Sequence, residues 1–246
     1  MPPQLQGLLC AIFLIAILAA SREGWCDSVT LQQGVSGYAG TRDATIFSDQ
    51  PSNSVGGFSY IFSGNIQFGG TRRALISFDL DGVLSPDAVV TTATLHLIVD
   101  RTKSASDVHE LHRLLRDWGE GSVDAIGSGG SGAPAESGDA TWTSAFLSTD
   151  LWTTAGGDFA PAASGSGPLG FTGSAGDIVG PGMVADITAW LADPSSNHGW
   201  ILLGNETQST TARRLCSSEF PTAASRPSLT IDFTTPPAET DLWMLR

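Results

Sequence analysis

Apolar and polar residues alternate regularly along two stretches of the chain. Residues 92–100 (TATLHLIVD) and residues 72–80 (RRALISFDL) each place an apolar side chain at every second position. The apolar residues are Ala93, Leu95, Leu97 and Val99 in the first stretch, and Ala74, Ile76, Phe78 and Leu80 in the second. Successive side chains of a strand point to opposite faces of a sheet, so the pattern predicts two strands that are each buried on one face.

Shorter stretches of strand-like composition occur along the rest of the chain. We expect strands in residues 27–33, 45–47, 169–172, 183–187, 200–204, 212–220 and 227–233. Turns rich in Gly and Pro, such as residues 50–57 and the flexible loop 127–139, separate them. Residues 200–204 (WILLG) are apolar on both faces, which predicts a central strand.

Helical signals are confined to two places. Thr188 is expected to begin a short helix that carries Trp190 and Leu191 and ends before Pro194. Residues 108–118 (VHELHRLLRDW) have apolar side chains at helical spacing, and the local residue preferences also favour a helix. The pattern of this stretch is therefore ambiguous between a helix and a strand.

The composition favours an all-β chain. Among 246 residues there are 29 Gly and 13 Pro, only 15% of residues are charged, and Lys103 is the single lysine. Many short strands joined by Gly-rich turns, with one short helix, are typical of an antiparallel β-sandwich. We therefore predict one domain over residues 27–234, with about nine to twelve strands.

The first 21 residues carry no charged side chain. Their apolar run, Gly7 to Ala20, is shorter than the roughly 20 residues that span a bilayer, and it suits the h-region of a signal peptide. We expect residues 1–21 to be a signal peptide and the protein to be secreted, the alternative being a retained membrane anchor. Residues 235–246 are expected to form a C-terminal tail.

Cysteine positions fit an oxidising compartment. Cys10 belongs to the predicted signal peptide, whereas Cys26 and Cys216 lie near opposite ends of the predicted domain. These two could form a disulfide bond outside the cell; the alternative is two free thiols.

The charge of the chain excludes two classes of partner. The net charge is −13, and between Asp117 and Ala212 there are 11 acidic residues and no Lys or Arg. Such a chain repels nucleic acid and anionic membranes, so neither is expected as a partner once the signal peptide is removed. The carboxylates could hold structural calcium, but the D-x-[DN]-x-[DN]-G loop does not occur in the sequence and no cofactor is expected.

Nine motifs follow one another along almost the whole predicted domain. They are SVTLQQGVSGYAGTRDATIF (28–47), GGTRRALISFDL (69–80), TTATLHLIV (91–99), RDWGEGS (116–122), DATWTS (139–144), DLWTTAGGDF (150–159), DITAWLADPSSNHGWILL (186–203), RLCSSEF (214–220) and SRPSLTIDF (225–233). In their order and spacing, over about residues 28 to 233, they resemble the DNRLRE domain family, which is grouped with carbohydrate-binding module family 96.

The resemblance implies a secreted jelly-roll sandwich, of a kind often attached to polysaccharide-degrading enzymes, with some members binding alginate-type polymers. It also implies a strand, and not a helix, for residues 108–118. The chain departs from the family at Ser218, where a basic residue is usual. Its acidity is also a poor match for an anionic polymer.

Sugar binding requires aromatic faces that stack on C–H groups of the ring, together with hydrogen-bonding groups. Tyr38, Trp142 and Trp152 lie in or near Gly-rich loops and are candidates for this role. Trp190 and Trp200 have apolar neighbours and are expected in the core.

Arginine supplies a planar fork of donors, and Arg73, Arg213 and Arg214 are further candidates for ligand contact. They belong to the doublets 72–73 and 213–214. Because successive strand residues face opposite sides, only one member of each doublet can join a given surface. The alternative role is structural pairing with the abundant carboxylates.

Glycoside hydrolysis would need two facing carboxylates. Asp117 and Glu120, beside Trp118, are the best local candidates, and the alternative is a β-turn in which Asp117 caps backbone N–H groups. The motifs G-x-S-x-G, H-E-x-x-H and the P-loop do not occur in the sequence.

His109 and His112 would share a metal ion with Glu110 on a helix, but on a strand they point to opposite faces, so no metal site is expected.

The stretch ARRLCSSEF (212–220) gathers reactive side chains without a nearby histidine. We expect Glu219 to be partly buried and to hold a neighbouring strand or loop through Arg72 or Arg73. Asp43 is also expected to have a structural role.

These observations predict a secreted, non-catalytic module that binds polysaccharide or a cell-surface glycan. One alternative is a structural or adhesive extracellular protein that binds no sugar specifically. Another is a polysaccharide lyase or hydrolase.

Overall fold

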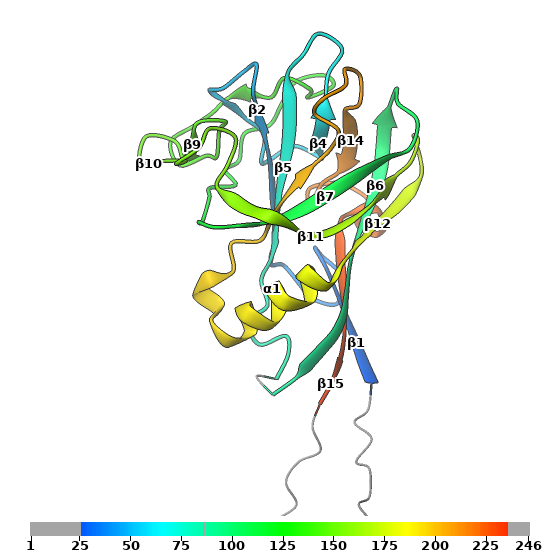
Figure 1. Ribbon diagram of the computed structural model, residues 1–246. Helices are drawn as coiled ribbons and strands as arrows, with labels where there is room; N and C mark the ends of the chain where they lie inside the picture. Colours follow the sequence, from blue (N-terminus) through cyan, green and yellow to red (C-terminus); the bar gives the residue numbers. More distant parts are fainter. Residues whose placement is uncertain (1–25, 86, 236–246) are drawn as a thin grey trace, which may run out of the picture.

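The computed structural model describes residues 26–85 and 87–235, and most of its strands form a closed antiparallel barrel of eight strands (Figure 1). These strands are β4 (Tyr60–Asn65), β5 (Thr71–Phe78), β6 (Val89–Thr102), β7 (Asp107–Leu114), β11 (Phe159–Leu169), β12 (Ala175–Val179), β13 (Trp200–Leu203) and β14 (Arg213–Cys216). The order is β6, β12, β11, β7, β13, β5, β4 and β14, and β14 pairs back to β6. The all-β prediction is confirmed. The jelly-roll sandwich is not confirmed, because the hydrogen bonds continue around the ring.

Two strands extend the sheet beyond the barrel. β15 (Ser228–Thr234) pairs with the first part of β6, and β1 (Cys26–Gln32) pairs with β15 along its whole length. Both run from the end of the barrel opposite to the β4–β5 hairpin (Figure 1). The ends of the ribbon lie together, since Cys26 is directly opposite Thr234.

The remaining strands lie outside the ring. β2 (Thr41–Phe47) pairs with β5, and two short pairs join β3 (Asn53–Ser54) to β8 (Ala133–Pro134) and β9 (Ser144–Phe146) to β10 (Asp150–Leu151). The predicted flexible loop 127–139 therefore contains one short strand.

The two alternating stretches form β5 and β6, and their apolar side chains fill the main core. All eight residues predicted to face inward are buried. Burying a side chain of this size stabilises the fold by about 1.5–3 kcal/mol, so the pattern that predicts the strands also accounts for their burial. Trp190 and Trp200 belong to the same cluster, with ring centroids 4.6 Å apart.

The helix is longer than predicted. α1 (Pro181–Ala192) packs against β6 and β11, and it includes the residues 183–187 that we expected to form a strand. Met183, Ile187 and Trp190 recur at helical spacing and are all buried, and Pro181 suits the first turn. Thr188 lies inside the helix, where its hydroxyl donates to the Val184 carbonyl at 2.8 Å, and does not cap its start.

Two strands, β11 and β12, occupy a segment rich in Gly, Ser and Pro for which we expected only one short strand at residues 169–172. Their glycines allow close packing of the backbones. A Cβ atom on Gly167 would lie 1.9 Å from the carbonyl oxygen of Asp177 in β12. Glycine is needed here for close approach, so its abundance was wrongly interpreted as a sign of a loop.

The strand implied for residues 108–118 is confirmed over residues 107–114, where β7 hydrogen-bonds to β11 on one side and β13 on the other. The helix favoured by local spacing does not form there, because pairing on both edges overrides helix propensity.

Both predicted terminal segments fall outside this description. The signal peptide at residues 1–21 lies before its start, and only Thr235 of the predicted tail is within it. Among the described residues, no helix has the length and apolar character needed to cross a membrane.

Candidate functional site

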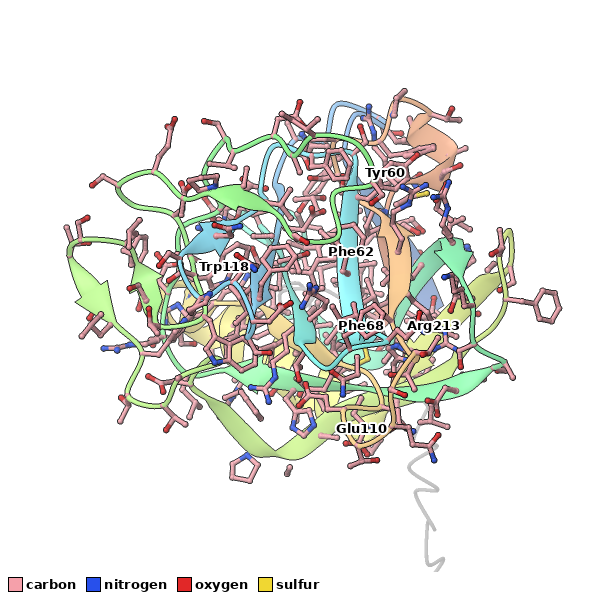
Figure 2. The ribbon with its side chains drawn as sticks, turned by 90° about the horizontal axis from the view of Figure 1, so that it is seen from above. Tyr60, Phe62, Phe68, Glu110, Trp118 and Arg213 are labelled. Atoms are coloured by element: carbon pink, nitrogen blue, oxygen red, sulfur yellow. The ribbon has the colours of Figure 1, made fainter. Side chains whose placement is uncertain are left out.

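A pocket of about 340 Å³ opens beside the β4–β5 hairpin. The residues around it come from that hairpin, from the end of β6 and the residue after it, from the loop 128–130 and from the start of β14. They are Phe62, Asn65, Ile66, Gln67, Phe68, Arg72, Arg101, Thr102, Lys103, Ser128, Gly130, Thr210, Ala212, Arg213 and Arg214. We call this site the basic pocket. Figure 2 shows Phe62, Phe68 and Arg213 near one another, with Trp118 well to one side.

Positive charge is concentrated in the basic pocket. Five of the chain's 12 Lys and Arg residues line it, although the net charge of the chain is −13. Two of them are balanced by carboxylates, since Arg72 pairs with Asp49 and Arg214 pairs with Asp100. Arg101, Lys103 and Arg213 make no ion pair with any residue that the structure describes, so the pocket attracts anions.

Arg101 and Lys103 differ from the three arginines in their freedom to reach a ligand. Both are exposed, and neither donates a side-chain hydrogen bond to another described residue. The donors of Arg72, Arg213 and Arg214 are largely engaged with protein oxygens. The arrangement therefore combines three arginines held by protein oxygens with two exposed cations that are free of such contacts among the described residues.

The aromatic component of the pocket is Phe68, near the tip of the β4–β5 hairpin. Its side chain is 90% exposed. The following Gly69 and Gly70 have φ angles of 79° and 116°, which allow the tight turn that presents the ring. Phe62 in β4 is buried beneath. An exposed ring beside cations suits a ligand with an apolar face and negative groups.

Arg213 supplies charge to the pocket from a buried position. It is 0% exposed, and its guanidinium donates to the carbonyls of Leu169, Gly170 and Thr211 at 3.0–3.2 Å and also to that of Ala105. Burial lowers the pKa of Arg213 from its usual range. We predicted direct ligand contact for Arg213; its donors are instead occupied by backbone carbonyls from three segments of the chain.

Arg214 lies on the opposite face of β14, and it also lines the basic pocket. The expectation that only one member of this doublet can join a given surface is therefore wrong here. The guanidinium of Arg214 pairs with Asp100 and lies over the Tyr60 ring, so this side chain too is engaged within the protein.

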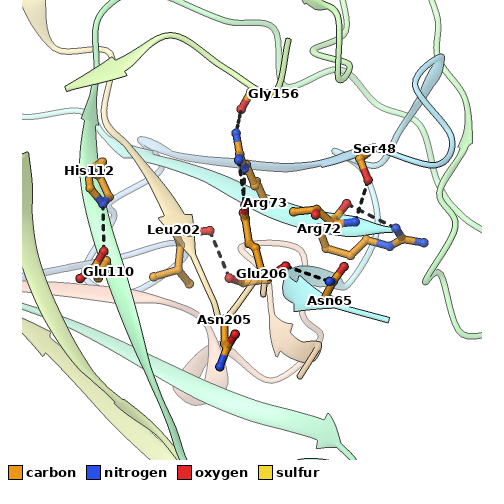
Figure 3. A network of polar contacts seen from close by, with 12 residues as sticks. Ser48, Asn65, Arg72, Arg73, Glu110, His112, Gly156, Leu202, Asn205 and Glu206 are labelled. Carbon is orange, nitrogen blue, oxygen red and sulfur yellow. Dashed lines mark hydrogen bonds and ion pairs between the residues drawn. The ribbon is translucent and has the colours of Figure 1, made fainter. Parts of the chain in front are cut away.

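Arg73 lies away from the basic pocket, on the side of β5 opposite to Arg72 (Figure 3). It donates to both carboxylate oxygens of Glu206 at 2.8 Å and to the Gly156 carbonyl at 2.7 Å. Its guanidinium also lies over the Trp142 ring, with the central carbon 4.9 Å from the ring centroid. The predicted ligand residues Arg73 and Trp142 thus contact each other, and Arg73 has the structural pairing that was its alternative role.

Two further predicted aromatic contacts are engaged within the protein. Trp152 is 5% exposed and donates its indole N–H to the Thr141 carbonyl at 2.9 Å, so it is unsuited to stacking on a sugar. Tyr38 is partly exposed, packs on the main core and donates to the Asp79 carbonyl at 3.2 Å. Neither residue lines the basic pocket.

The candidate carboxylates Asp117 and Glu120 have separate partners. Asp117 pairs with Arg42 at 3.0 Å, whereas Glu120 accepts the backbone N–H of Asp43 at 2.7 Å. Among the described residues, no Asp, Glu, His or Cys lines the basic pocket, so these two carboxylates lie outside it.

Glu219 does not have the contacts that we predicted. It is exposed, and Arg72 and Arg73 pair with Asp49 and Glu206 instead. Its Oε1 accepts a hydrogen bond from the Ser218 hydroxyl at 2.8 Å, and the Ser218 N–H donates to Asp43 at 2.7 Å. The loop after β14 is therefore held in place by Asp43, which is fully buried.

Among the described residues, Cys26 is exposed in β1, Cys216 is buried in β14, and the two form no disulfide bond with each other. Burial raises the pKa of Cys216 to about 11, so its thiol is less readily ionised. The predicted disulfide is therefore not formed in the structure, where the two cysteines lie in different parts of the sheet.

The histidines at 109 and 112 point in different directions. His109 is fully buried, and burial lowers its pKa to about 4. His112 contacts the Ala160 carbonyl at 2.9 Å. Within residues 26–85 and 87–235, no three or more His, Cys, Asp or Glu side chains form a group that could hold a metal ion.

Comparison with known proteins gives no match to any family model and none to a curated protein. The resemblance to the DNRLRE family therefore rests on the residues quoted above.

Sequence reasoning missed Phe68, Arg101 and Lys103. A usable signal was present, because Phe68 precedes two glycines before a strand, and RTK (101–103) contains the only lysine in a chain with few cations.

Proposed function

We propose that the protein is a secreted, non-catalytic module that binds an anionic polysaccharide in the basic pocket. The observation that carries the proposal is the gathering of five cations around an exposed phenylalanine in a strongly acidic protein. Sulfate or carboxylate groups on the polymer would pair with Arg101 and Lys103, while the C–H face of a sugar would stack on Phe68.

The overall acidity does not oppose this ligand. Interactions between exposed charges separated by more than about 10 Å are largely screened at 0.1 M salt, so the local charge of the pocket outweighs the distant carboxylates. The acidic remainder would instead discourage nonspecific adsorption of the polymer elsewhere on the protein.

The proposal includes three further points. The chain belongs to the DNRLRE family, its fold is related to a jelly roll, and residues 1–21 are a signal peptide. The barrel end that carries the basic pocket is opposite to the β1–β15 ribbon (Figure 1). A module attached to another domain or surface through that ribbon would present the pocket outward.

Equilibrium binding to three polymers tests the proposal. Dextran sulfate and polygalacturonate carry sulfate and carboxylate groups, respectively, and dextran is neutral. We expect the first two to bind, with affinity that falls as salt is raised from 50 to about 500 mM, and dextran not to bind. The double variant R101Q/K103Q should lower the affinity about tenfold, because each exposed ion pair contributes about 0.7 kcal/mol.

A charge-matched control is R113Q/R116Q, which removes two cations of β7 and the segment after it, outside the basic pocket. It should bind like the wild type. Equal loss in both double variants would mean that net charge, and not the pocket, determines binding. Failure to bind any of the three polymers would favour a structural or adhesive protein, and release of reducing ends or unsaturated sugars would favour an enzyme.

A further inference from the structure

Three carboxyl side chains from distant parts of the chain meet beside β2. Asp43 lies in β2, Glu120 follows β7, and Glu219 follows β14. Alternation along β2 turns Thr41, Asp43 and Thr45 inward, and all three are buried. Asp43 itself is 0% exposed. We call Asp43, Glu120 and Glu219 the carboxyl cluster.

Hydrogen bonds connect the cluster to two loops. The Asp43 N–H donates to Glu120 Oε1 at 2.7 Å, and the Ser218 N–H donates to Asp43 Oδ2 at 2.7 Å. The Ser218 hydroxyl donates to Glu219 Oε1 at 2.8 Å. The second oxygen of Asp43, Oδ1, is buried and has no hydrogen-bond partner among the described residues.

The nearby cations are engaged with other groups. Arg42 binds Asp117 and the Trp118 carbonyl, at 3.0 and 3.2 Å. Arg226 binds the carbonyls of Phe220 and Gln33, at 2.7 and 2.8 Å. Neither forms an ion pair with the carboxyl cluster, so an ionised Asp43 would be a buried charge facing two others of the same sign.

A proton on Asp43 removes this conflict. Burial, followed by the charges of Glu219 and Glu120, holds the pKa of Asp43 well above its usual range. Burial likewise raises the pKa of Glu120 to about 7.

The loops held by the carboxyl cluster form part of the basic pocket. Glu120 begins the segment that contains Ser128 and Gly130, and Ser218 follows the strand that carries Arg213 and Arg214. The same segment is held at its far end by Arg72, whose Nε donates to the Gly130 carbonyl at 2.8 Å. Between these two ends, the Val123 carbonyl accepts the N–H groups of Gly56 and Gly57, at 3.3 and 2.9 Å. Loosening the cluster would free the Glu120 end of the segment and leave these other attachments in place.

We propose that the carboxyl cluster holds the wall of the basic pocket in place when protonated and releases it when ionised, so that ligand binding weakens as the solution becomes alkaline. Only the weakening of ligand binding at alkaline pH rests on the proposed function. The release of the pocket wall is a property of the unliganded protein.

Limited proteolysis without ligand tests the release. The variant Asp43→Asn carries an amide N–H where the protonated acid has its O–H, so it should stay closed at every pH. The cleavage rate of residues 121–132 by proteinase K is measured for wild type and variant at pH 5 and pH 8. Comparing both proteins at the same pH cancels the pH dependence of the protease.

The expected ratio of wild-type to Asp43→Asn cleavage is near one at pH 5 and about ten at pH 8, since each unit of pKa shift corresponds to about tenfold in population. Glu219→Gln changes the exposed member of the cluster. At pH 8 this variant should be cleaved more slowly than the wild type, as Asp43→Asn is. Asp87→Asn, at an exposed carboxylate outside the cluster, should behave like the wild type. A ratio that does not change with pH would overturn the proposal.

A binding measurement separately tests whether ligand binding weakens at alkaline pH. Dextran sulfate keeps its charge between pH 5 and pH 8. Its affinity for the wild type should fall about tenfold over this range, and its affinity for Asp43→Asn should stay constant. If dextran sulfate binds neither protein, the proposed function fails while the proteolysis still decides the behaviour of the cluster. Equal pH dependence in both proteins would contradict regulation by the cluster.

Discussion

The guanidinium carbon of Arg214 lies 3.9 Å from the centre of the Tyr60 ring, and its Nε donates to Asp100 Oδ2 at 2.6 Å. Arg214 therefore connects β14 to both strands that flank it in the barrel, β4 and β6. A planar cation is needed for this pair of contacts, because it stacks on the ring and forms ion-paired hydrogen bonds at the same time.

Replacing Arg214 by lysine should lower the free energy of unfolding by about 1 kcal/mol, since lysine keeps the charge but loses most of the stacking. Urea denaturation measures this change. Arg101→Lys is the control, because Arg101 is exposed and unpaired among the described residues. Equal stability of the two variants would show that the contact between Arg214 and Tyr60 contributes nothing.

Arg213→Met should destabilise the protein far more, by about 3 kcal/mol. The methionine would fill most of the space but leave four carbonyls, from three segments, without their donor, and unsatisfied buried acceptors are costly. Chemical denaturation measures the loss. A change as small as that of Arg101→Gln would show that these carbonyls find other partners.

The contribution of the carboxyl cluster to stability should decrease as pH rises from 5 to 8. Asp43 and Glu120 have folded-state pKa values above those of the unfolded chain, the latter at about 7. For these two groups the folded state binds more protons in this range, so their stabilising contribution is complete below about pH 4 and is lost as pH rises through the folded pKa. Burial lowers the pKa of His109 to about 4, which has the opposite effect but acts equally in the wild type and in Asp43→Asn. The melting temperature of the wild type should therefore fall relative to that of Asp43→Asn over this range. A difference between the two proteins that stays constant or changes in the opposite direction would contradict the assignment of the proton.

Gly167→Ala should destabilise the barrel by 1–3 kcal/mol or more, roughly the cost of overpacking, because the added methyl group would collide with the Asp177 carbonyl in β12. Gly130→Ala is the matched control, since no atom lies within 4 Å of its Cβ position. Thermal unfolding of both variants decides the point. A neutral Gly167→Ala would mean that β11 and β12 can separate without loss.

Phe68→Ala should weaken polysaccharide binding about three- to tenfold, the loss of 0.5–1.5 kcal/mol of aromatic contact, and should leave the melting temperature unchanged. Ile126→Ala removes a side chain of comparable exposure, 96% against 90%, that does not line the basic pocket. Isothermal titration with dextran sulfate compares the two. Equal affinities would exclude Phe68 from the binding surface.

The parts of the fold that the sequence predicted are those where one strand face is buried. The alternation in residues 72–80 and 92–100 predicts β5 and β6 because burying one face imposes a period of two. The secondary-structure predictions are wrong where the same residue types are compatible with two structures. Glycines such as Gly167 are typical of loops, but here Gly167 allows two strands to pack closely. Met183 and Ile187 fit the pattern of a strand as well as that of the helix that forms.

The basic pocket could not be predicted because its parts are local in space and distant in sequence. Phe68, Arg101 and Arg214 come together only through pairing of β14 with β4 and β6. The same holds for Asp43 and Glu219, whose proximity depends on the loop after β14. The arginine doublets were recognised, but the strand pattern could not tell which member faces a ligand.

The pairing of β1 with β15 also bears on engineering. Residues that pair directly across antiparallel strands have Cα atoms about 5 Å apart, so Cys26 and Thr234 could be joined by a short Gly-rich linker without disturbing the barrel. New termini could then be opened in the exposed turn around Gly173, far along the chain from both ends. Such a circular permutant would keep every barrel strand intact and move the point of attachment from one end of the molecule to its side.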